Sequence, residues 1–178
     1  MELVRTKLAP PLNSADLLER PRLQQRIDDA ANVSLTVVQA PAGYGKTSLL
    51  SQWFSALKPS PYKVCWLSID TSDRDAVRVL CYVAAALEAG GVRFEPLIER
   101  GLATETYTDA ETLVAALIEC LRLCAKPVYI FLDDVHLLPP EPLSALCRLI
   151  DHSPTTAHFI IASRVIPDLH LADRKSVV

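Results

Sequence analysis

The stretch that decides the fold runs Ala40-Pro41-Ala42-Gly43-Tyr44-Gly45-Lys46-Thr47. It follows an apolar, β-branched run over residues 33–39 and opens a helical pattern over residues 46–57. This order of strand, glycine-rich turn and helix directs backbone N–H groups and a helix N-terminus toward one anion. The stretch fits the phosphate-loop (P-loop) pattern GxxxxGK[ST] except at its first position, which is Ala40.

A site for ATP or ADP with Mg²⁺ is the first prediction from this loop. We expect the phosphates to lie against Ala42, Gly43, Tyr44, Gly45, Lys46, Thr47 and Ser48. The ammonium of Lys46 would reach the β- and γ-phosphates, and the hydroxyl of Thr47 would ligate Mg²⁺. The alternative is a glycine turn with an exposed lysine and no ligand.

Two adjacent acids end a second apolar run. Residues 128–132 are apolar and strand-like, and Asp133 and Asp134 follow them. Carboxylates at the C-terminal end of a parallel strand lie at the rim where α/β folds bind ligands. We expect Asp133 to hold Mg²⁺, mostly through water, and Asp134 to orient or polarise the attacking water. The alternative is a solvated turn or a helix N-cap.

Two further residues follow predicted strands at the same edge. His136 lies two residues beyond the acid pair, where a phosphate-sensing role and a structural role in a turn are both open. Arg164 ends the last predicted strand, and we assign it a catalytic role. A cation there could read the γ-phosphate or stabilise the charge that develops in transfer. A surface arginine is the alternative.

The rest of the chain alternates strands with helices. Three more strands are predicted, at residues 63–69, 127–133 and 157–162. Helical patterns cover residues 75–89, 109–125 and 142–151. Such alternation predicts parallel βαβ units. An extended, proline-bearing lead and a helix over residues 20–31 precede the first strand, and a short helix is expected near residues 96–100.

Composition excludes several other classes of protein. The net charge of −3 gives the 178 residues no basic footprint for nucleic acid. The apolar runs are shorter than the roughly 18 residues that a membrane helix needs, and the N-terminus lacks the apolar stretch of a secretory signal. We therefore expect a cytoplasmic protein without membrane contact. The five cysteines lie in apolar segments, which indicates buried thiols rather than disulfides or a metal site.

Six short motifs, in order along the chain, resemble those of one known family. They are Thr6-Lys7-Leu8, Arg20-Pro21-Arg22-Leu23, the loop at residues 40–47, Trp66-Leu67-Ser68-Ile69-Asp70, Leu132-Asp133-Asp134-Val135-His136 and Ala162-Ser163-Arg164. Together they resemble the ATPase domain of the large ATP-binding LuxR-type transcription regulators, which belong to the STAND class of P-loop ATPases. Alanine at the first P-loop position is usual in that group.

The resemblance implies an α/β P-loop NTPase of the ASCE/STAND type, with a parallel sheet flanked by helices. It implies a slow ATP-hydrolysing switch, in which ADP holds a resting form and ATP with an inducer favours a self-associating form. By position, Lys46 and Thr47 match the Walker A residues, Asp133 and Asp134 match the Walker B pair, and Arg164 matches the sensor arginine. DNA binding is implied only through a C-terminal domain that this chain lacks.

The domain organisation follows from the same comparison. We expect an N-terminal lead and helix over residues 1–32, an incomplete NTPase core over residues 33–172, and a non-native tail over residues 173–178. The tail matches one reading frame of a common sequencing adapter. Because the family's last core strand would follow Arg164 and is expected to be missing, the strand at residues 33–39 is predicted to have an unpaired edge and to promote aggregation.

Three other nucleotide-binding classes stay open on sequence alone. A small-molecule kinase typically carries an arginine-bearing lid over its acceptor, and none is evident between the last predicted helix and Arg164. A motor of the AAA type often has glutamate as the second Walker B acid, where this chain has Asp134. A module that binds nucleotide without turnover is the third possibility.

Overall fold

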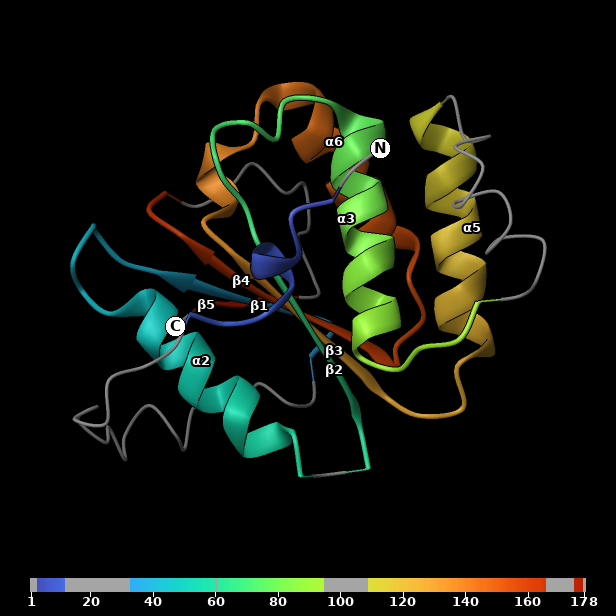
Figure 1. Cartoon of the computed structure of the whole chain (residues 1–178), viewed down its shortest axis with the longest axis horizontal. Coiled ribbons are helices and arrows are strands. Elements are labelled where there is room, and N and C mark those ends of the chain that lie inside the picture. The colour runs from blue at the N-terminus through green and yellow to red at the C-terminus, as the bar shows by residue number, and fades with distance from the viewer. Residues whose placement is uncertain (1–2, 12–32, 60, 95–108, 166–174, 178) are drawn as a thin grey trace.

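The sheet of this protein is wholly parallel, as a computed structural model of the chain shows (Figure 1). The structure describes residues 3–11, 33–59, 61–94, 109–165 and 175–177. Within them five strands pair in the order β2-β3-β4-β1-β5. Their bounds are β1 Leu35–Gln39, β2 Lys63–Ser68, β3 Val128–Asp133, β4 Ala157–Ser163 and β5 Lys175–Val177.

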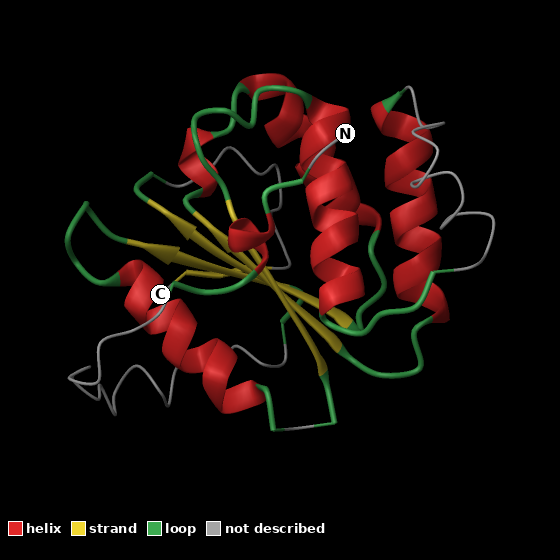
Figure 2. Cartoon of the chain, viewed as in Figure 1, coloured by secondary structure: helices red, strands yellow, loops and turns green. Residues whose placement is uncertain are grey.

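Helices cover both faces of the sheet (Figure 2). Helix α2 (Lys46–Leu57) covers one face, and α3 (Ala76–Ala89), α5 (Ala110–Leu123) and α6 (Pro140–His152) cover the other. Two short 3₁₀ turns complete the described elements, η1 (Arg5–Leu8) and η2 (Val135–Leu137). This arrangement confirms the predicted α/β class. No helix in the described part of the chain is long and apolar enough to cross a membrane.

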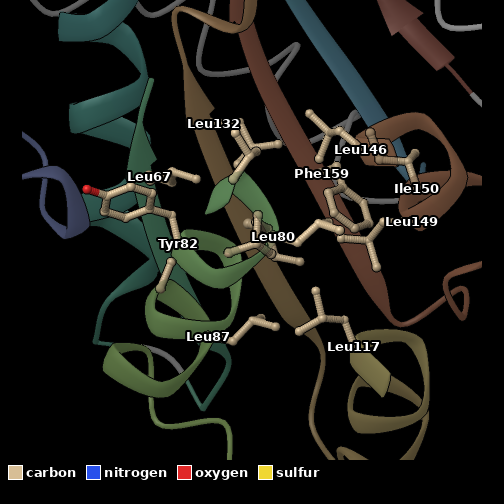
Figure 3. Close-up of a cluster of buried hydrophobic side chains, with 14 of the residues drawn as sticks. Leu67, Leu80, Tyr82, Leu87, Leu117, Leu132, Leu146, Leu149, Ile150 and Phe159 are labelled. Atoms are coloured by element: carbon tan, nitrogen blue, oxygen red, sulfur yellow. The ribbon is translucent and has the colours of Figure 1, made fainter. Parts of the chain in front are cut away.

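Strand alternation divides the core into two clusters. In β3, Ile130 and Leu132 point toward α3, α5 and α6, whereas Tyr129 and Phe131 point toward α2. The larger cluster contains leucines from three helices, such as Leu80, and Phe159 from β4 (Figure 3). All six residues of β3 are buried, as expected of a strand with helices on both faces.

An aromatic cluster fixes α2, the helix that follows the phosphate loop. Trp53 of α2 meets Phe131 edge to face at 5.5 Å between ring centroids, and Phe54 meets Trp66 in the same way at 5.7 Å. Trp66 and Phe131 stack at 6.0 Å. Such aromatic pairs add to the stabilisation from burial. They fix α2 over the sheet through its second half.

The predicted elements agree with the structure to within two residues at each end. Helix α2 has the predicted bounds, and α6 begins two residues early, because proline is accepted in the first turn of a helix. The predicted helices at residues 20–31 and 96–100 lie outside the described residues. One prediction is wrong in detail: the extended lead contains the 3₁₀ turn η1, where Lys7 is buried by ion pairs described below.

The free edge predicted beside β1 is also wrong. Strand β5 pairs with β1 in parallel and sets Lys175 opposite Leu35 and Val177 opposite Val37. Main-chain groups make this pairing, so a short extended segment can join the edge whatever its side chains are. The bare edge that we expected to promote aggregation is therefore covered over residues 35–37. The non-native origin of residues 173–178 stays a prediction.

Candidate functional site

The loop between β1 and α2 takes its shape from two glycines. Gly43 and Gly45 have φ values of 82° and 78°, in the left-handed region that other residues rarely adopt. A Cβ at Gly43 would meet no heavy atom within 4 Å, so backbone conformation rather than crowding requires glycine there. Gly45 immediately precedes α2, and its carbonyl accepts the N–H of Leu49 at 2.9 Å. The loop therefore turns into the N-terminus of α2, as predicted.

Lys46 is buried beneath this loop without an acidic partner. Lys46 is 7% exposed, and its Nζ donates to the carbonyls of Ala40 at 2.7 Å and Pro41 at 2.9 Å. Among the described residues no carboxylate forms an ion pair with it. A buried cation normally has a counter-charge, and two carbonyl dipoles supply only part of one. The arrangement suits an anion beside the loop.

Asp133 ends β3 and is 4% exposed. Burial raises the pKa of its carboxyl, as does the charge of Asp134, against a hydrogen bond from Thr47 and the charge of Lys46. Its Oδ1 is buried and has no hydrogen-bond partner among the described residues. A buried carboxylate oxygen beside a threonine hydroxyl is the donor set that Mg²⁺ prefers. Asp133 and Thr47 thus fit the predicted Mg²⁺ site.

Asp134 has a strained backbone at the start of η2. Its φ is 59°, and among the described residues it is the only one other than glycine with a positive φ. Its carbonyl accepts the N–H of Leu137 at 3.0 Å, but its side chain makes no capping hydrogen bond. The N-cap alternative for this acid is therefore not supported. The carboxylate is 36% exposed and lies 3.7 Å from Nδ1 of His136.

Arg164 and Tyr44 lie at the exposed side of the same rim. Arg164 follows β4, is exposed, and lies close enough for its charge to lower the pKa of His136. Tyr44 is 66% exposed at the tip of the loop, beside the exposed Ala42. Ser48, in the first turn of α2, is half-buried. The sequence-predicted residues thus gather around the C-terminal ends of β1, β3 and β4.

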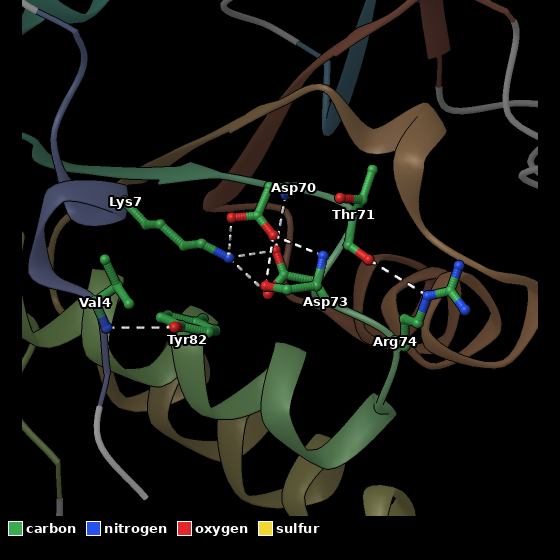
Figure 4. A network of polar contacts seen from close by, with 8 residues as sticks. Val4, Lys7, Asp70, Thr71, Asp73, Arg74 and Tyr82 are labelled. Carbon is green, nitrogen blue, oxygen red and sulfur yellow. Dashed lines mark hydrogen bonds and ion pairs between the residues drawn. The ribbon is translucent and has the colours of Figure 1, made fainter.

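The sequence analysis names Lys7 in a motif but does not predict that this second lysine is buried among carboxylates (Figure 4). Nζ of Lys7 lies 2.8 and 2.7 Å from the carboxylate oxygens of Asp73 and 2.9 Å from Asp70. It also lies 4.7 Å from the ring centroid of Tyr82, in a cation–π contact. Asp73 is 2% exposed and accepts the backbone N–H of Asp70 at 2.9 Å. This cluster joins η1 to the end of β2 and the start of α3.

Comparison with known proteins agrees with this geometry. The sequence pattern described as "AAA ATPase domain" matches residues 18–162. The chain belongs to the AAA ATPase domain family. It is similar to the HTH-type transcriptional regulators MalT of Serratia proteamaculans and Yersinia pestis, at 32% and 31% identity over 176 residues, or 96% of this chain. The chain spans about a fifth of the length of these regulators, 19% in each case.

Solved structures share the fold at low sequence identity. A STAND protein with a tetratricopeptide-repeat sensor from Pyrococcus horikoshii matches 95% of this chain with a TM-score of 0.65, over 24% of its own length. Cdc6p from Pyrobaculum aerophilum matches 92% of this chain with a TM-score of 0.62, over 43% of its own length. Both are 17% identical in sequence. These likenesses establish a P-loop NTPase fold for the chain.

Proposed function

We propose that this chain is the ATP- and ADP-binding switch domain of a LuxR-type transcription regulator. One observation carries the proposal: Lys46 is buried at a helix N-terminus, contacts two carbonyls and forms no ion pair with a carboxylate of the described residues. The terminal phosphates of a nucleotide are the counter-charge that this arrangement lacks. The similarity to MalT over nearly the whole chain supports the choice of regulator rather than another ATPase.

Each residue of the rim has a role in this proposal. The backbone of residues 42–48 cradles the phosphates, and Lys46 turns from the carbonyls toward the β- and γ-phosphates. Thr47 and Asp133 would hold Mg²⁺, and the ion would supply positive charge to neutralise the phosphate oxygens. Asp134 orients the attacking water, and Arg164 stabilises charge on the transferring group.

Slow turnover fits the same rim. Asp134 has one methylene fewer than glutamate, so its carboxylate extends less far from the backbone toward the phosphate. Arg164 is exposed and thus not fixed by packing. A switch needs nucleotide states that last longer than a motor's cycle, which is consistent with weakly assembled catalytic groups. We accordingly propose ATP hydrolysis as a slow regulatory step.

The remaining functions belong to the longer protein. By similarity to the MalT regulators, we propose that it is cytoplasmic, self-associates when ATP is bound, and contacts DNA through a domain outside this chain. The net charge of −3 offers DNA no basic footprint here. An AAA-type ATPase of another class and a small-molecule kinase are the alternatives.

Nucleotide titration and phosphate release separate these functions. The switch predicts binding of both ADP and ATP, with slow phosphate release that candidate acceptors do not accelerate. A kinase would transfer phosphate to an acceptor, and a motor would release it rapidly. Failure of the purified chain to bind either nucleotide would refute the proposal.

A further inference from the structure

His136 is half-buried, but both nitrogens of its imidazole are enclosed by the described part of the chain. Its side chain is 10% exposed, and neither ring nitrogen has a hydrogen-bond partner among the described residues. An enclosed polar atom without a partner has lost its hydrogen bonds to water and gained none in return, so such atoms are rare in folded proteins. The same chain shows the usual arrangement: Nδ1 of His158 lies 3.0 Å from the carbonyl of Val33, and its ring stacks on Tyr129.

The backbone brings His136 back toward Asp134. The left-handed conformation of Asp134 starts η2, and the N–H groups of Leu137 and Leu138 close the turn on the carbonyls of Asp134 and Val135. Val135 is fully buried and fixes the turn in the core. Nδ1 of His136 thereby lies 3.7 Å from Oδ1 of Asp134, slightly beyond hydrogen-bond distance.

Charged groups from three parts of the fold act on this imidazole. They are Asp134 in its own turn, Lys46 at the start of α2 and Arg164 directly after β4. Burial lowers the pKa of His136, as do the charges of Arg164 and Lys46, while Asp134 opposes them. The imidazole is therefore neutral near pH 7, with one N–H donor and one acceptor nitrogen.

We propose that His136 is a positioning residue for Asp134, with its Nδ1–H directed at the Asp134 carboxylate. When nucleotide fills the rim, the separation closes to a hydrogen bond, and the carboxylate is held toward the attacking water. This inference rests on the proposed function, because Asp134 needs aiming only if a phosphate lies beside it. It explains why two enclosed ring nitrogens have no hydrogen-bond partner among the described residues while one of them lies 3.7 Å from a carboxylate oxygen.

Nitrogen NMR of the histidine rings tests the contact directly, without nucleotide. The spectrum of the ¹⁵N-labelled chain distinguishes Nδ1–H from Nε2–H tautomers, and His136→Gln assigns the signal. We expect the Nδ1–H tautomer in the parent and a shift toward Nε2–H in Asp134→Ala, which removes the acceptor. An Nε2–H tautomer in the parent, or no change in the Asp134 variant, would overturn the proposal.

Turnover by two conservative variants tests the role. The amide nitrogen of asparagine can replace Nδ1, whereas that of glutamine can replace Nε2. We expect His136→Leu to reduce turnover by up to about 100-fold with ADP affinity nearly unchanged, since one group is misplaced. His136→Asn should recover more activity than His136→Gln, and the exposed His152→Gln should behave as the parent.

The two assays separate the two claims. If the parent binds no nucleotide, the proposed function fails, while the tautomer still decides the contact between His136 and Asp134. If the parent hydrolyses ATP and His136→Leu matches it, the positioning role fails while the proposed function stands. Equal recovery by the asparagine and glutamine variants would also contradict the assigned nitrogen.

Discussion

Two lysines of this chain are equally buried but differently partnered. Lys7 and Lys46 are each 7% exposed. Lys7 meets two carboxylates within 3 Å, whereas Lys46 meets two carbonyls and, in the part of the chain that the structure describes, no carboxylate. Lys7 is thus neutralised by carboxylates in direct contact, whereas the described residues give Lys46 only carbonyl dipoles in contact and the charge of Asp133 from beyond ion-pair distance. The comparison shows that burial of a lysine does not by itself indicate a binding site. The contacts of Lys46, which are carbonyls rather than carboxylates, are what indicate an anionic ligand.

The difference also assigns separate roles to the two regions. The hydrogen bonds to Asp73 and Asp70 and their charges outweigh burial and raise the pKa of Lys7, so it stays charged in a structural lock between η1 and β2. Lys46 belongs to a loop whose conformation depends on two left-handed glycines. Substitution of Lys7 should therefore affect stability, and substitution of Lys46 should affect nucleotide affinity.

The largest expected effect is on affinity. Lys46→Ala should weaken ATP and ADP together by about 100-fold, near the upper value for a charge-assisted hydrogen bond to phosphate. Both nucleotides carry the β-phosphate, so the loss should be similar for the two. Isothermal titration measures it, with Lys58→Ala as the control, because Lys58 is exposed at the end of the same helix. Unchanged affinity in Lys46→Ala would refute the assignment of the phosphate loop.

The next effect is on stability. Lys7→Met should lower the free energy of unfolding by about 3 kcal/mol, because it leaves the Asp73 carboxylate buried without its cation. Urea unfolding measures this loss, and the exposed Arg5→Met is the matched control. Combining Lys7→Met with Asp73→Asn should recover part of it. If Lys7→Met lost affinity for ADP without losing stability, the structural role assigned to Lys7 would be wrong.

The two acids of the rim should respond differently. Asp133→Asn should weaken the Mg²⁺ dependence of nucleotide binding, since Oδ1 of Asp133 lacks another partner. Asp134→Asn should leave Mg·ATP binding within about twofold and abolish turnover. Titrations with and without Mg²⁺, together with phosphate release, separate the two outcomes. Identical behaviour of the variants would show that the roles are not divided.

The smallest effect concerns pH. Hydrogen bonds from Ser72 and Lys7 lower the pKa of Asp70 to about 2, against an ordinary value near 3.8. Its carboxylate therefore stabilises the fold above about pH 4, and this contribution is lost as pH falls toward 2. The stability difference between the parent and Asp70→Asn should shrink over that range. Urea unfolding at pH 6, 4 and 3 checks it, and a constant difference would contradict the assignment.

The sequence predicted the parts of the fold that depend on local pattern. Strand β3 and helix α2 follow from a buried apolar run and from the loop that precedes Lys46, and both lie where periodicity placed them. The burial and ion pairs of Lys7 were missed, although Lys7 lies in one of the six motifs, because its partner Asp73 is 66 positions away. Strand β5 was missed because main-chain pairing leaves no side-chain pattern.

The backbone conformation, hydrogen bonding and exposure of the site residues depend on tertiary packing, which no local sequence pattern encodes. The sequence showed the pair of acids, Asp133 and Asp134. The left-handed backbone of Asp134 and the ring nitrogens of His136, which have no hydrogen-bond partner among the described residues, appear only in the folded chain. The exposure of Arg164 was likewise not predictable from its place after an apolar strand. These details turn a motif into specific expectations for each residue.

The most direct test of the central claim compares ADP with adenosine in thermal unfolding. Because the counter-charge of Lys46 is assigned to the phosphates, saturating ADP should raise the Tm of the parent, and adenosine at the same concentration should raise it much less. In Lys46→Ala the difference between the two ligands should nearly disappear. Equal stabilisation by ADP and adenosine in the parent, or an undiminished ADP effect in Lys46→Ala, would contradict the account.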